Sequence, residues 1–227
     1  MFNNIKPVLA GLLCLAFASC KKDMVDESGV TPENNAAKSS VTSEANDSYY
    51  PDANGSTYTY VDSTLGGSST ITRSAMKVAG DTVIDGQNFS RTATKGSSTF
   101  DYYSSANGVT TLITFKGKDK VTTTVLKANE PVGTVWKDVF SNAGVPTTYE
   151  WKIVAKGINK TVRGVAYANV IQVHLLGYAQ VPAQGKVVFA DSDYFYAPNI
   201  GLIENISFNP TTGKTELHRE LQNMPVH

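Results

Sequence analysis

Cysteine is nearly missing from this chain of 227 residues, which has only Cys14 and Cys20. Because no cysteine follows Cys20, the rest of the chain cannot form disulfides, catalytic thiolates, iron–sulfur clusters or cysteine-ligated zinc. Histidine is also scarce, and HExxH spacing does not occur. Three scattered histidines without cysteine argue against a zinc site. We therefore predict no metal site and no cofactor.

Charge of one sign is not in excess, since 20 basic residues balance 20 acidic ones. This balance gives no electrostatic reason to expect nucleic acid as a partner. The sequence also lacks the GxSxG, Walker and GxGxxG patterns of hydrolases, NTPases and dinucleotide-binding proteins. We predict no catalytic residues from motifs.

Helical periodicity does not persist beyond about two turns anywhere in the chain. Glu216 to Leu221 is the one short candidate for a helix, and it could equally be an edge strand. What the sequence does contain is strand-forming residues, most densely from Thr161 to Phe208. Breaker clusters at 182–185 and 197–199 divide this stretch, which predicts three consecutive antiparallel strands. Their expected ranges are 170–176, 187–196 and 200–208.

Alternation along these strands predicts which side chains share a face. In the first strand, His174 should lie on the face opposite Val173 and Leu175, and we expect it to be a strand histidine rather than a base or a ligand. In the third strand, the set with the greater apolar weight is expected to face the core, with Glu204 at a rim or a bulge. This set is Ile200, Leu202, Glu204 and Ile206.

Further strand patterns upstream extend the prediction to the whole domain. We predict an all-β fold of two antiparallel meanders that form a sandwich or a curved half-barrel, with few or no helices. The two series, 48–126 and 127–222, match at several positions 78 residues apart, among them Gly55 with Gly133 and Tyr58 with Trp136. Internal duplication explains these matches, and so does chance in a chain rich in glycine and aromatic residues.

The amino-terminal segment predicts export and lipidation. Lys6 precedes an apolar run from Val8 to Ala18 that is too short to span a bilayer. Small residues before Cys20 resemble a bacterial lipobox, which implies a signal peptide over 1–19 and acylation of Cys20. Residues 20–47 are polar and lack periodicity, so we expect a disordered linker to a β-rich domain over 48–222.

A resemblance to known proteins rests on two patterns in the densest strand region. Tyr196-Ala197-Pro198-Asn199-Ile200-Gly201-Leu202-Ile203 follows Asn169-Val170-Ile171-Gln172-Val173. These segments are similar to uncharacterised β-rich envelope lipoproteins of Bacteroidota and to a family called TapB-like. The resemblance implies an outer-membrane lipoprotein on the periplasmic or surface-exposed side, and it implies no activity.

Aromatic residues give the main candidate for a binding site. Tyr194 and Tyr196 share a strand face and, with Trp136, could stack on a small apolar or carbohydrate ligand. Alternatively, such residues only cover the core. Asp191 and Asp193 also share a strand face. They could contribute two carboxylate ligands to a Ca²⁺ site, but the simpler interpretation is a solvent-exposed polar surface.

The predicted function is a non-enzymatic, membrane-anchored envelope protein that binds such a ligand or assembles with envelope proteins. A hydrolase or carbohydrate-active enzyme with dispersed carboxylates is the alternative.

Overall fold

The computed structural model describes residues 48–50, 55–64, 70–94, 99–116, 119–142 and 144–223. The predicted signal peptide, Cys20, nearly all of the predicted linker and His227 lie outside these residues. Within the described ranges every regular element is a β-strand, which confirms the all-β prediction. No helix there has the length and apolar character needed to cross a bilayer.

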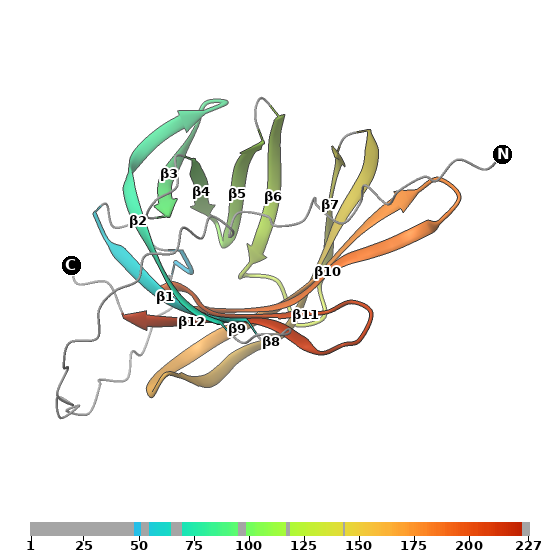
Figure 1. Cartoon of the computed structure of the whole chain (residues 1–227). Helices are drawn as coiled ribbons and strands as arrows, with labels where there is room; N and C mark the ends of the chain where they lie inside the picture. Colours follow the sequence, from blue (N-terminus) through green and yellow to red (C-terminus); the bar gives the residue numbers. More distant parts are fainter. Residues whose placement is uncertain are drawn as a thin grey trace. The chain divides into compact units, whose positions relative to one another are not determined.

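Twelve strands make up a single antiparallel sheet (Figure 1). In chain order they are β1 Thr57–Thr64, β2 Thr70–Ile84, β3 Gln87–Thr94, β4 Phe100–Ala106, β5 Val109–Lys116, β6 Asp119–Lys127, β7 Val135–Asn142, β8 Val145–Val162, β9 Val165–Val181, β10 Gly185–Ala197, β11 Gly201–Phe208 and β12 Thr215–Asn223.

The strand order shows two meanders of six strands, joined edge to edge. It runs β6-β5-β4-β3-β2-β1-β12-β11-β10-β9-β8-β7, so β1 pairs with β12 at the centre, and β6 and β7 are the two ends. The three strands predicted in the densest region are β9, β10 and β11, which pair antiparallel as expected. The segment from Glu216 to Leu221 belongs to β12, which is central and is neither a helix nor an edge strand.

Both meanders start with the same backbone hydrogen bonds. Gly55 N–H donates to Val78 C=O, and Val78 N–H donates to Ser56 C=O. In the second meander Gly133 N–H donates to Ile153 C=O, and Ile153 N–H donates to Thr134 C=O. Gly55 and Gly133 both have positive φ, 90° and 91°, which a glycine accommodates without strain. The internal duplication itself stays a prediction.

The sheet curves strongly, so that strands far apart in the strand order face each other across its inner side (Figure 1). Tyr103 on β4 and Tyr194 on β10 are an example, because they interact electrostatically although five strands separate them in the strand order. The inner face is therefore filled by side chains of both meanders. Of the two predicted architectures, a sandwich and a curved half-barrel, this arrangement corresponds to the curved half-barrel.

The outer face is covered locally by the far end of the β8–β9 hairpin. Phe195, Glu204 and Glu220 are register partners across β10, β11 and β12. Lys160, near the hairpin end, has its Nζ 3.7 Å from the Phe195 ring centroid and 2.5 Å from Glu204 Oε2. Arg163 Nη1 lies 3.3 Å from Glu220 Oε2. The hairpin end therefore forms a second layer over these strands.

This second layer overturns the predicted register of β11. Ile200 of the predicted core set is buried in the core, but Leu202 is only half-buried and Ile203, outside the set, is fully buried, so the predicted set is right in part and wrong at Leu202. A bulge between Phe195 and Tyr196 shifts the alternation, and Glu204 is buried because the hairpin covers it. Alternation alone assumes one buried face, and β11 has two.

Candidate functional site

The three predicted stacking residues lie in one row of aromatic rings on the inner face of β7, β8 and β10. Tyr194 and Tyr196 stack with ring centroids 6.4 Å apart. The Trp151 ring is 5.7 Å from that of Tyr194 and is stacked at 6.4 Å on that of Trp136. The structure thus brings Trp136 to the two tyrosines through Trp151, which the sequence analysis did not single out.

The row continues towards the β7–β8 turn. The Tyr149 ring lies 6.4 Å from that of Trp151, 5.1 Å from that of Phe140 and 6.2 Å from that of Phe189. Gly177 gives these rings their space, because a Cβ there would lie 2.8 Å from Phe189 Cε2 and 3.2 Å from Tyr149 Cε1. The row therefore follows most of the length of the inner face.

Four rings of the row are buried in this structure, Tyr149 among them, whereas Phe140, Phe189 and Tyr194 are partly exposed. Trp136, Trp151 and Tyr196 are 7%, 3% and 8% exposed. Burial raises the pKa of the Tyr149, Tyr194 and Tyr196 hydroxyls above the ordinary value. A ligand can reach the two tryptophan rings and the ring of Tyr196 only if the inner face opens.

The place where it can open is the seam, by which we mean the junction between the end strands β6 and β7. Strand pairing does not join these two strands, which are the ends of the sheet. Side chains of β7 bind the backbone of Thr124 on β6 instead. Thr124 N–H donates to Asp138 Oδ2 at 3.0 Å, and Trp136 Nε1–H donates to Thr124 C=O at 2.6 Å.

Asp138 connects the seam to the aromatic row. Its Oδ2 also accepts a hydrogen bond from Trp151 Nε1–H at 3.1 Å. Burial raises the pKa of Asp138, although the hydrogen bonds from Thr124 and Trp151 oppose that rise. Both tryptophans of the row therefore stabilise the seam. Trp136 binds Thr124 directly, and Trp151 binds Asp138, which in turn binds Thr124.

Polar groups lie on the same inner face, beside the aromatic row. Ser192 Oγ donates to Ser207 Oγ at 3.0 Å, and Asn205 Nδ2 donates to Asp193 C=O at 3.1 Å. Farther along, Arg219 makes a buried bidentate pair with Asp62, at 2.7 and 2.6 Å. The inner face thus has an aromatic side on β7–β10 and a polar side on β10–β12 and β1.

The carboxyls of the inner face do not form a coupled acid pair. Burial raises the pKa of Asp101 to about 6. Asp138 is raised by burial as well, and neither group perturbs the other. Catalysis by a pair of carboxyl groups, one as acid and one as base, requires that the two groups interact electrostatically or lie beside the same substrate bond. Among the described residues, these two do not meet that requirement.

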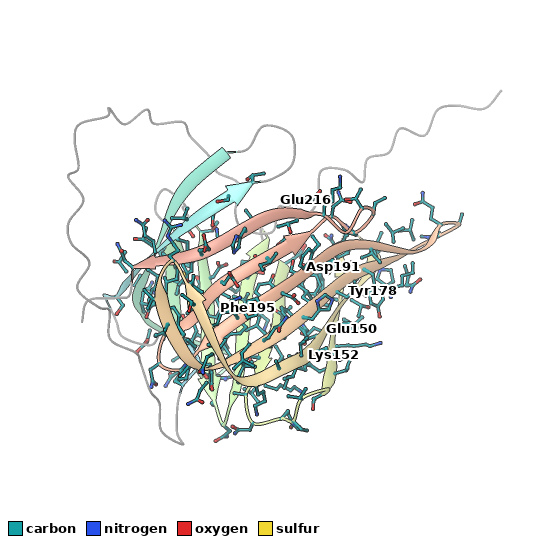
Figure 2. The ribbon with its side chains drawn as sticks, turned by 90° about the horizontal axis from the view of Figure 1, so that it is seen from below. Glu150, Lys152, Tyr178, Asp191, Phe195 and Glu216 are labelled. Atoms are coloured by element: carbon teal, nitrogen blue, oxygen red, sulfur yellow. The ribbon has the colours of Figure 1, made fainter. Side chains whose placement is uncertain are left out.

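His174 lies on the outer face between the two carboxylates noted in the sequence. Val173 and Leu175 are buried and His174 is partly exposed, which confirms the predicted alternation. Its Nδ1 is 2.9 Å from Asp193 Oδ1, and its Nε2 is 3.6 Å from Asp191 Oδ1. The hydrogen bond to Asp193 raises the pKa of His174, against the effect of partial burial. Figure 2 shows Asp191 on this charged outer surface, with Glu150 and Lys152.

A second outer cluster could in principle hold a metal ion. Ligand atoms of Glu204, His218 and Glu220 lie within 4.8 Å of one another. However, Lys160 and Arg163 already pair with the two carboxylates, and His218 Nε2 is 2.9 Å from Glu204 Oε1. Positive charges that neutralise the carboxylates compete with a cation, so we interpret the cluster as an ion-pair network that fixes the hairpin end.

One sequence signal could have identified the seam. Trp136, Asp138 and Phe140 alternate on one face of β7, so a lone carboxylate interrupts an aromatic face. A polar residue at such a position must have hydrogen-bond partners. Its partner Thr124 lies only 14 residues upstream, but β6 and β7 do not pair as strands, so a search for strand pairs does not find this contact.

Comparison with known proteins gives similarity of fold. No protein-family model matches the chain, and no curated protein matches it. A candidate lipoprotein from Parabacteroides distasonis has a similar structure, with a TM-score of 0.55 and 11% identity over 80% of this chain and 100% of its own. At this identity the similarity concerns the fold alone.

Two other solved structures are more distant. A candidate exported protein with a YmcC-like fold from Bacteroides fragilis has a TM-score of 0.46, with 12% identity over 78% of this chain and 99% of its own. A LolA superfamily protein from Nitrosomonas europaea has a TM-score of 0.30, with 8% identity over 77% and 86%. None of the three is described as TapB-like, so that resemblance stays a prediction.

Proposed function

We propose that this chain is a lipid-anchored protein of the bacterial envelope that binds a small amphipathic ligand, without catalysis, on the inner face of β7–β10. The observation that carries this proposal is the seam. Its bonds at Thr124 come from Trp136 and Asp138, and these residues also belong to, or contact, the aromatic row. Opening the seam therefore breaks a few side-chain hydrogen bonds and exposes the rings.

The chemistry of the inner face supports an amphipathic ligand. The aromatic side offers apolar ring surface, and the polar side offers hydroxyl, amide and guanidinium groups. A ligand with one apolar and one polar part would contact both sides. The hydrolase alternative is less well supported, because Asp101 and Asp138 do not act on each other.

The envelope location rests on the lipobox-like segment before Cys20, with the candidate lipoprotein of similar fold as support. We expect Cys20→Ser to abolish acyl labelling and to release the protein from the membrane fraction. A Cys20→Ser protein that still partitions into detergent would contradict the anchor. Protease shaving of whole cells then distinguishes surface display from a periplasmic position.

Tryptophan fluorescence tests the binding site directly, because the only two tryptophans of the chain are Trp136 and Trp151. Titration of the lipid-free mature chain with dodecanoate, a single-chain amphiphile, should give a saturable change in emission. Asp138→Ala should speed association, since it removes the bond to Thr124. Lys137→Ala, the neighbouring outer-face change, should not. Absence of a saturable change in wild type and in Asp138→Ala would contradict the proposal.

A further inference from the structure

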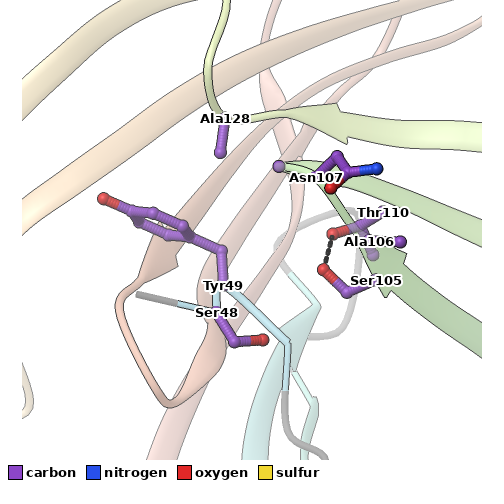
Figure 3. Close-up of a pocket in the computed structure, with 8 residues that line it drawn as sticks. Ser48, Tyr49, Ser105, Ala106, Asn107, Thr110 and Ala128 are labelled. Carbon is purple, nitrogen blue, oxygen red and sulfur yellow. Dashed lines mark hydrogen bonds between the residues drawn. The ribbon is translucent and has the colours of Figure 1, made fainter. Parts of the chain in front are cut away.

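A pocket of about 170 Å³ lies beside the turn between β4 and β5 (Figure 3). One wall is the turn between β4 and β5, and the other is the segment Ser48–Tyr49, which precedes the sheet. Its lining includes Ser48, Tyr49, Ser105, Asn107, Thr110 and Ala128. Neither Trp136 nor Trp151 lines it, so this pocket is separate from the site proposed above.

Among the described residues that line the pocket, most are polar and the phenol of Tyr49 is the one ionisable group. Ser105 Oγ and Thr110 Oγ1 lie 3.2 Å apart and share one hydrogen bond (Figure 3). Each hydroxyl has one donor and two acceptor positions, so the pair keeps capacity for a ligand. Asn107 adds an amide, and the ring of Tyr49 adds the aromatic part of the wall.

The walls are fixed by hydrogen bonds to three different strands or turns. Tyr49 Oη–H donates to Asn169 C=O at 2.9 Å, and Asn199 N–H donates to Ser48 C=O at 2.5 Å. On the other wall, Asn129 Nδ2–H donates to Asn107 C=O at 3.0 Å. Tyr50, next to Tyr49, is buried with its ring stacked on that of Tyr103 at 4.7 Å. Hydrogen bonds and ring stacking therefore hold the segment Ser48–Tyr50 in place, and a hydrogen bond from Asn129 holds the opposite wall.

We propose that this pocket binds a single ring of a neutral sugar. Hydroxyl groups and a side-chain amide beside one aromatic ring match the hydroxyls and the apolar C–H face of a pyranose. The lining residues that the structure describes include no Lys, Arg, Asp or Glu, which disfavours phosphates, carboxylates and amines. The volume is below the roughly 300–1,000 Å³ of pockets for drug-sized ligands, so it accepts one ring and excludes a nucleotide or an acyl chain.

Saturation-transfer NMR on the lipid-free mature chain tests this proposal with glucose, galactose, mannose and N-acetylglucosamine. Glucuronate and glucose 6-phosphate are the charged comparators. At least one neutral sugar should bind, and the charged sugars should bind more weakly. Thr110→Val keeps the shape and removes one hydroxyl, so binding should be about three- to tenfold weaker. Thr122→Val, on the exposed side of β6, is the matched control and should bind as wild type.

Three results would overturn the sugar site. These are no binding of any neutral sugar, preference for a charged sugar, and equal binding by wild type and Thr110→Val. Tyr49→Phe separates the ring from its hydroxyl, since it keeps the aromatic wall and removes the bond to Asn169. It should keep sugar binding, whereas Tyr49→Ala should lose it. The dodecanoate titration can fail while sugar binding succeeds, so the two proposals fail independently.

Discussion

Asp138 shows how a single side chain can take over the role of strand pairing. Its carboxylate accepts hydrogen bonds from the Thr124 backbone on one side and from the Trp151 ring on the other. Charged acceptors make hydrogen bonds roughly twice as strong as neutral ones. One half-buried carboxylate can therefore hold two edge strands together at a point where their backbones do not pair.

Two neighbouring residues on β11 test the corrected register. Ile203→Ala should lower the free energy of unfolding by about 2–5 kcal/mol, because it leaves a cavity in the core. Leu202→Ala should cost clearly less, since Leu202 is only half-buried. Paired urea unfolding of the two variants is the measurement. A larger loss for Leu202→Ala would restore the register that sequence alternation predicts.

Asp101 predicts a pH dependence of stability. Its folded pKa of about 6 lies above the ordinary value near 3.8, so the folded state holds the proton more tightly than the unfolded chain. Stability should therefore fall as the pH rises through this interval and stay level above it. Asp101→Asn removes the buried charge and should add about 1–3 kcal/mol at neutral pH and almost nothing near pH 4. Urea midpoints at both pH values are the check, and an equal gain at both would contradict this account.

For single residues, the sequence predicted which side chains are important better than it predicted which other side chains they contact. Tyr194, Tyr196 and Trp136 were identified as aromatic residues in strands, and the structure places them in one row. Trp151 joins them, and it was overlooked because it pairs with Trp136 across two strands rather than along one. The role of Asp138 was not predicted for the same reason, since both of its hydrogen-bond partners lie on other strands.

Among the elements, β1 and β12 do the most to unite the fold, because their pairing joins the two meanders. Asp62 and Arg219 are register partners at this junction and form its buried bidentate ion pair. A buried charge without its partner is strongly destabilising, whereas loss of both charges together is much less costly. The ion pair therefore makes the pairing of these two strands specific.

Removal of one charge at this junction should show that dependence. Arg219→Met leaves Asp62 buried and unneutralised, and should cost about 3–5 kcal/mol of unfolding free energy. The double variant Arg219→Met/Asp62→Leu should be more stable than the single variant. Lys137→Met breaks an exposed pair with Glu150 and should leave the free energy of unfolding nearly unchanged. Thermal unfolding of the four proteins gives the comparison, and equal losses for the two single variants would refute the role of the junction.

Strand positions were the most predictable feature of the elements, and strand environment the least. Breaker residues such as Pro182 and the Asn107-Gly108 pair mark turns through their own backbone preferences, so β4, β5, β9 and β10 follow from local sequence. The covering of β11 by the β8–β9 hairpin depends on bends in that hairpin. Register shifts between Ile153 and Lys160 provide those bends, and alternation does not predict them.

For the whole molecule, the decisive feature is that a sheet of twelve strands curves until its ends approach without pairing. Edge strands that remain unpaired expose backbone groups, which proteins usually cover or protect. Here the seam covers Thr124 with Trp136 and Asp138, at the point where the aromatic row begins. Closure and ligand access thus depend on the same residues.

A disulfide across the seam tests this central claim most directly. In a Cys20→Ser protein, Thr124→Cys with Asp138→Cys places two thiols at positions that are now joined by a hydrogen bond of 3.0 Å. The reduced protein has lost the two hydrogen bonds of Asp138 and keeps only the bond from Trp136 Nε1–H to the Thr124 C=O, so it should bind dodecanoate, as followed by tryptophan emission. The oxidised protein should not bind, and reduction should restore binding. Equal binding by the oxidised and reduced forms would contradict entry through the seam.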